Sequence, residues 1–326
     1  MIMATASAPS RQGPSTTHEL SAPPLFSEGW LEFNRVRWKV DLLPVQYGEN
    51  PFPRLEATFF LGAKGKIWRP PLVPYTSMCF KPSPTHAPFK LARHWLELGS
   101  KIAHETREHG LAGPMYLPPE IADVRPWSWL GFASAVKYTF YVDFPYSLSG
   151  ADHNVRAKIE RAARSGYSCA RTQDLKSVYV CLSKTAATQE FAFELSESDL
   201  KLAEQLMGAE CLRCYVCYAP DGEPASARVV LSTPGNRALV WLAGTNGHLQ
   251  SGATELLMHH LIEDLQKADL PGLDFVGANL PGVADAKAKW GSRLVPFYTI
   301  QGFSMRELAK IWYAAWRAGI VRWWEI

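Results

Sequence analysis

The chain has 326 residues, of which 47% are hydrophobic and 20% charged, a composition typical of globular proteins with a sizeable core. Its formal net charge of +3 is too small to predict nucleic-acid binding by itself, because that function needs a clustered basic surface. No run of about 18 apolar residues and no apolar secretory segment is present, so we expect a soluble cytoplasmic protein without a membrane span.

The first half of the chain mixes helix and strand patterns. Residues 1–24 are rich in Ser, Thr, Ala and Pro, which predicts a disordered tail. Strand-like runs at 55–61 and 137–143 flank an amphipathic helical pattern at 89–109. Five prolines between residues 65 and 85 exclude a central strand there, so we expect an edge or loop segment.

The second half begins with a helical pattern at 153–167 that has one apolar face. Its other face is basic, with Arg156, Lys158, Arg161 and Arg164. Ser196, three residues before Asp199, predicts a capped helix at 196–207. The patterns that follow predict a hairpin at 214–232 with a turn at 220–224, a strand at 238–245, a helix at 252–267, and strands at 273–278 and 294–300.

Three cysteines at positions 211, 214 and 217 have a spacing similar to that of metal-binding motifs. An iron–sulfur run needs a fourth cysteine, and no His or Cys pair is placed to complete a zinc site. We therefore interpret them as small apolar residues near a strand and predict no metal site.

The C-terminal segment 304–326 carries four of the twelve tryptophans. Apolar residues at helical spacing alternate with basic ones from residue 306 onward, which predicts an amphipathic helix. Docking on the protein body or on a second subunit explains this stripe best, and peripheral membrane contact through 306–326 is the alternative.

A set of motifs resembles a known family. The motifs lie at 138–143 (Tyr-Thr-Phe-Tyr-Val-Asp), in the Arg-rich helix at 156–166, at 274–279 (Asp-Phe-Val-Gly-Ala-Asn) and at 286–291 (Ala-Lys-Ala-Lys-Trp-Gly). Their order and spacing resemble the FemAB/CelD-like branch of double-GNAT acyltransferases, which includes the Fem-type aminoacyltransferases. The resemblance covers roughly residues 120–302, and Arg161 stands where the family usually has Lys.

The resemblance implies a mixed α/β (α+β) fold with two GNAT-like domains, each a mixed sheet flanked by helices. We expect a degenerate first domain at 25–150 and an acyltransferase domain at 151–303, followed by the amphipathic helix. It also implies N-acyl or aminoacyl transfer from an activated donor to an amine on a sugar, peptide or lipid-linked acceptor.

The candidate catalytic residues are Lys287, Asp274 and Asn279. Lys287 stands at the position of the family's motif lysine and would neutralise a phosphate or stabilise the oxyanion. Asp274 would accept the amine proton, although a strand-borne Asp can equally cap the next turn. The candidate donor- and acceptor-binding residues are Trp241, Ala243, Gly244, Gln250, Gly252, Arg156, Lys158, Arg161, Arg164 and Lys289.

The nature of the donor stays open. Acetyl-CoA-dependent GNAT enzymes have a glycine-rich phosphate loop, but residues 248–254 hold a single glycine, and Glu255 would repel phosphate. Acyl-CoA and aminoacyl-tRNA therefore both stay candidate co-substrates, with no permanently bound cofactor and no DNA partner expected. The basic helix face would contact tRNA, or is simply solvated. A catalytically silent GNAT-like scaffold or partner-binding module is the alternative function.

Overall fold

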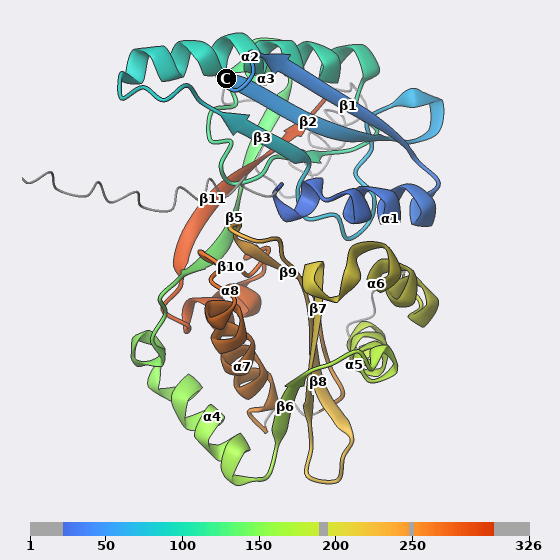
Figure 1. Cartoon of the computed structure of the whole chain (residues 1–326), viewed down its shortest axis with the longest axis vertical. Coiled ribbons are helices and arrows are strands. Elements are labelled where there is room, and N and C mark those ends of the chain that lie inside the picture. Colours follow the sequence, from blue (N-terminus) through green and yellow to red (C-terminus); the bar gives the residue numbers. More distant parts are fainter. Residues whose placement is uncertain (1–21, 189–194, 248–250, 303–326) are drawn as a thin grey trace, which may run out of the picture.

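The computed structural model describes residues 22–188, 195–247 and 251–302. Together they form a mixed α/β fold with two sheets (Figure 1). The strands in this part of the chain are β1 (Asp41–Gly48), β2 (Arg54–Leu61), β3 (Ser77–Lys81), β4 (Met115–Tyr116), β5 (Ala133–Asp143), β6 (Ser168–Arg171), β7 (Leu212–Tyr218), β8 (Pro224–Leu231), β9 (Ala238–Thr245), β10 (Gly272–Asp274) and β11 (Arg293–Gln301).

Helices cover both sheets. The α-helices in the described ranges are α1 (Glu28–Trp38), α2 (Pro88–His109), α3 (Arg125–Ser128), α4 (His153–Arg164), α5 (Leu175–Thr188), α6 (Glu197–Cys211), α7 (Ala253–Lys267) and α8 (Pro281–Ala288). Short 3-10 turns lie at η1 (Pro24–Phe26), η2 (Ala63–Gly65) and η3 (Leu148–Gly150). None of these helices is long and apolar enough to cross a membrane.

The smaller sheet is antiparallel, in the order β1-β2-β3. Helix α2 packs on it through the apolar residues Trp95, Leu98 and Ile102, which share one face because they recur at helical spacing. Strand β3, which lies within the Pro-rich segment between Pro74 and Pro82, is at the edge of this sheet. The expected edge or loop position of residues 65–85 is thus confirmed, and the five prolines lie in the loops on either side of this short strand.

The larger sheet has the order β4-β11-β5-β10-β9-β8-β7-β6. Its pairings are antiparallel except for β9 and β10, which run parallel and are joined by the crossover helix α7. Helices α4 and α7 cover one face and α5 and α6 the other (Figure 1). Because side chains alternate along a strand, Val229 of β8 faces α5 and α6 while Val230 faces α7.

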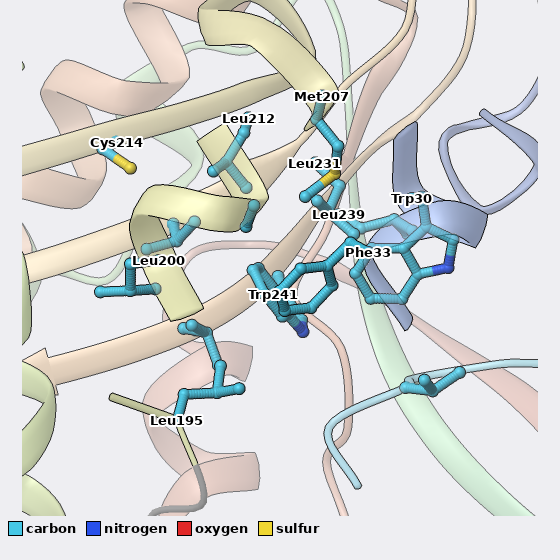
Figure 2. Packing of buried hydrophobic residues seen from close by; sticks show 14 of the residues in the cluster. Trp30, Phe33, Leu195, Leu200, Met207, Leu212, Cys214, Leu231, Leu239 and Trp241 are labelled. Atoms are coloured by element: carbon cyan, nitrogen blue, oxygen red, sulfur yellow. The ribbon is translucent and has the colours of Figure 1, made fainter. Parts of the chain in front are cut away.

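An aromatic cluster fastens the first helix to the larger sheet (Figure 2). Trp241 of β9 contacts Trp30 and Phe33 of α1 edge-on, with ring centroids 5.3 and 5.6 Å away. The indole Nε1 of Trp241 donates a hydrogen bond of 3.0 Å to the carbonyl of Leu72. Strand β9 is therefore held in place by segments that precede it by more than a hundred residues.

Most elements that carried a clear pattern are confirmed. Helix α7 and strands β9 and β11 lie within one residue of their expected bounds, and Ser196 caps α6 through a capping box with Asp199. Cys214 and Cys217 are buried in β7 as apolar residues. Helix α4 ends earlier than expected, at Arg164, because Gly166 takes a left-handed backbone conformation, with φ +82°.

Other elements were missed or differ from expectation. The pattern gave no signal for α1, α5 or α8, and strand β10 ends at Asp274 rather than continuing to residue 278. Strands β4 and β5 belong to the larger sheet although they precede residue 150, so this sheet crosses the expected domain division. That division stays a prediction. The expected tail, up to residue 21, and the expected helix at 304–326 lie outside the described residues.

Candidate functional site

The two parallel strands of the larger sheet separate soon after they pair. Strands β9 and β10 are in register only at Ala238 with Leu273 and at Leu239 with Asp274. Beyond this point β10 has ended, so the edge of β9 from residue 240 to 245 has no neighbouring strand on that side. A cavity of about 860 Å³ occupies the gap, and it is lined by residues of α4, α5, β8, β9, α7 and α8 and of the segment that follows β10.

Lys287 of α8 explains why β10 ends where it does. Its Nζ donates hydrogen bonds to the carbonyls of Phe275, Val276 and Gly277, at 2.8, 2.9 and 2.5 Å. These carbonyls converge on one point, and the backbone there turns through positive φ at Val276 (+50°) and Gly277 (+77°), which no strand can do. The ammonium has three N–H groups, so its donor capacity is filled by this turn.

Burial lowers the pKa of Lys287 to about 8, while the nearby Asp274 carboxylate acts in the opposite direction. The three carbonyl acceptors also favour the ammonium form. Lys287 lines the large cavity, as expected of a site residue. Its engaged donors make it a residue that shapes the cavity wall, and direct contact with a substrate stays a prediction.

The charges around the large cavity are partly paired. Lys158 of α4 contacts Glu255 of α7 at 2.7 Å, and Lys289 contacts Asp285 at 2.6 Å. Lys158 therefore compensates the charge of Glu255, and the expected repulsion of phosphate by that carboxylate is correspondingly reduced. The remaining cation in the described lining, besides Lys287, is Arg228.

Arg228 was not singled out in the sequence. It lies in the middle of β8, is 8% exposed, and lines the cavity floor. Its Nη1 donates to the Ala227 carbonyl at 2.7 Å, with longer contacts to Ser226 Oγ and the Gly244 carbonyl. Burial lowers the pKa of Arg228 to about 10. The sequence signal that could have indicated this residue is a single arginine within an otherwise largely apolar strand.

Asp274 faces a second cavity, of about 300 Å³, between the larger sheet and the segments around η1 and β3. It is fully buried, and its carboxylate accepts hydrogen bonds from the hydroxyls of Tyr75 and Thr139 and from the Val276 amide. Burial raises the pKa of Asp274 to about 6 against the effect of these donors. The group is thus both a turn-capping residue and a titratable one near neutral pH.

The structure does not bring the three candidate catalytic residues into one cavity. Lys287 lines the large cavity and Asp274 the second. Asn279 is exposed and pairs with the backbone of Tyr138, accepting from its amide at 3.0 Å and donating to its carbonyl at 3.3 Å. The Asn279 side chain thus attaches the segment that follows β10 to strand β5.

The candidate binding residues are also divided. Trp241, Ala243, Gly244, Lys158 and Lys289 line the large cavity.

Gly252 does not line this cavity but begins α7, in van der Waals contact with the backbone of α4 at Lys158. Arg156, Arg161 and Arg164 lie exposed on α4, outside the cavity lining. Gln250 lies outside the described residues.

Part of the chain matches a known family. Residues 149–287 match a family model described as an acetyltransferase (GNAT) domain. No curated protein matches the chain.

Among solved structures, FemX is similar with a TM-score of 0.60 and 10% identity, over 88% of this chain and 94% of FemX. L-PGS from Bacillus licheniformis is similar with a TM-score of 0.55 and 13% identity, over 89% of this chain and 96% of that one. At these identities the likeness is one of fold.

Proposed function

Because residues 149–287 match a GNAT acetyltransferase domain and the fold is similar to that of FemX, we propose that the chain transfers an acyl or aminoacyl group to an amine. The donor is acyl-CoA or an aminoacyl-tRNA, and the acceptor amine belongs to a sugar, a peptide or a lipid-linked molecule. In this reaction a C–N bond forms, the thioester or ester bond to the donor breaks, and the amine gives up a proton.

The observation that carries the proposal is the separation of β9 from β10 over the large cavity. A donor lying along the free edge of β9 meets unpaired backbone amides in the region of Leu242 to Gly244, since this edge has no neighbouring strand. Fixed N–H groups aimed at a carbonyl oxygen stabilise the oxyanion that forms on attack by the amine. No covalent nucleophile is needed for this chemistry.

The second cavity supplies a place for the acceptor. It reaches the point of strand separation through Leu239 and Asp274, which form the last paired position of β9 and β10. Asp274 is the group that would take the amine proton, because a carboxyl with a pKa of about 6 is mostly ionised at pH 7. Tyr75 and Tyr141 line the same cavity and donate to Asp274 and Glu120, respectively.

Lys287 acts in this proposal as a positioning residue. By holding three successive carbonyls it fixes the turn that forms the far wall of the gap between β9 and β10. Replacing it with methionine should lower kcat more than it raises KM, because the turn loses its anchor while the rest of the cavity is kept. Lys267→Met, which changes an exposed lysine at the end of α7 outside the cavity lining, is the matched control, and thermal melting of both variants detects general unfolding.

The donor is tested by binding acetyl-CoA and bulk aminoacylated tRNA to the purified protein in parallel. Salt-sensitive tRNA binding that weakens when Arg156, Lys158, Arg161 and Arg164 are neutralised supports a tRNA-dependent transferase. Binding of acetyl-CoA alone supports the acyl-CoA branch. Binding of neither would overturn the transferase proposal and favour a scaffold or partner-binding role.

The place of action stays part of this proposal. A cytoplasmic location agrees with both candidate donors. Membrane contact by the segment 306–326 would bring a lipid-linked acceptor within reach, and that segment lies outside the described residues.

A further inference from the structure

Arg228 is a buried cation that lacks a counter-ion. Within the described part of the chain, no carboxylate lies within salt-bridge distance of its guanidinium. Arg213, in the neighbouring strand β7, has the same exposure of 8% but contacts both Glu210 and Asp264, at 3.0 and 3.3 Å. Buried charges in proteins are usually paired with an opposite charge. Arg213 follows this rule, whereas Arg228 has no ion-pair partner among the described residues.

The hydrogen bonds of Arg228 show which edge of the guanidinium is available. All three contacts to protein acceptors come from Nη1. A guanidinium has five N–H groups, so the three on Nε and Nη2 have no acceptor among the described residues. Neither Nε nor Nη2 is fully enclosed by protein atoms. Because Arg228 lines the large cavity, we infer that this edge of the guanidinium faces the cavity.

We propose that Arg228 binds a phosphate group of the donor through its Nε and Nη2 edge. This inference rests on the proposed function of the large cavity as the donor site. Two parallel N–H groups match two oxygens of a phosphate, and such charge-assisted pairs are strongest where water is excluded. Lys158 lines the same cavity, where it pairs with Glu255 at 2.7 Å.

The chemistry is common to both candidate donors, because CoA and tRNA each carry phosphates. Arg228 lies opposite Ala243 in the register of β8 and β9, four residues beyond the last paired position of β9 with β10. At a rise of about 3.3 Å per residue, this places it roughly 13 Å along the strand from the last paired position. The phosphate would therefore lie beside the stretch of β9 along which the donor is proposed to run.

The experiment measures binding of CoA, deacylated bulk tRNA and inorganic pyrophosphate by calorimetry to the full-length protein and three variants. Arg228→Gln should weaken binding of the preferred donor about 10- to 100-fold, and Arg228→Lys should lie between it and the unmodified protein. Lys201→Gln, a surface change on α6 that removes the same charge, should bind as the unmodified protein does. For tRNA, Arg228→Gln should also reduce the salt slope by about one.

The outcomes separate this inference from the proposed function. Unchanged binding by folded Arg228→Gln and Arg228→Lys, with acyl transfer intact, would refute the phosphate contact and leave the transferase proposal standing. Arg228-dependent binding of pyrophosphate without binding of CoA or tRNA would support the anion site and overturn the donor assignment. If Arg228→Gln does not fold, the comparison of Arg228→Lys with the unmodified protein decides, since the charge is kept and only the two-pronged geometry is lost.

Discussion

Replacing Gly252 with alanine should destabilise the fold at the contact between α4 and α7. Gly252 has φ +87°, and an added Cβ would lie 2.3 Å from the carbonyl oxygen of Lys158. The left-handed backbone costs an alanine about 1–2 kcal/mol, and forcing two backbones apart costs about 1–3 kcal/mol more. We expect a total loss of about 2–5 kcal/mol in the free energy of unfolding.

The matched control is Gly222→Ala. Gly222 has the same φ of +87° and no heavy atom within 4 Å of an added Cβ, so only the backbone cost applies. Urea denaturation followed by circular dichroism measures both variants, and the difference between them isolates the close approach of the two helices.

Equal destabilisation by the two substitutions would refute the reasoning, because it would mean that α4 does not lie against the start of α7. A functional readout accompanies the stability measurement. The contact also holds Lys158 beside Glu255 at the cavity wall, so Gly252→Ala should weaken donor binding while Gly222→Ala should not.

Further predictions concern pH and the aromatic cluster. Transfer should decline below about pH 6 as the Asp274 carboxyl becomes protonated and can no longer accept a proton; a pH profile of kcat/KM that stays flat to about pH 5 would argue against this role. Tyr75→Phe removes a hydrogen bond that lowers the pKa of Asp274, so this limb of the profile should move to higher pH. Trp241→Phe should lower the stability by about 1–3 kcal/mol through the unpartnered Leu72 carbonyl, while the same change at the exposed Trp129, followed by thermal melting, should have little effect.

Much of the second half of the fold was predictable from the sequence because its elements have strong local patterns. The apolar residues of α7 recur at helical spacing, with Leu257, Leu261 and Leu265 buried on one face. Strands β9 and β11 are long and apolar, and the capping residues of α6 stand at their expected spacing. No comparable pattern marks α8, because this helix is short. None marks α1 either, because a few aromatic residues make up most of its buried face.

The candidate site was predictable in part. Lys287 was singled out from the family motifs, and it lies in the wall of the large cavity. The hydrogen-bond partners of Lys287 could not be predicted, because they are backbone carbonyls, which every residue type carries. Arg228 escaped notice since one charged residue in a strand is read as facing solvent, and only the neighbouring helix shows that this face is covered.

The two cavities have a kinetic consequence. Their described linings share no residue: the second cavity reaches β9 at Leu239, and the large one is lined by β9 from Val240 onward. Donor and acceptor would therefore occupy the protein at the same time without displacing each other. We therefore expect a ternary complex of enzyme, donor and acceptor. Initial-rate kinetics should give intersecting double-reciprocal plots rather than the parallel lines of a ping-pong mechanism. The acylated product and the spent donor would then leave by separate exits, in either order.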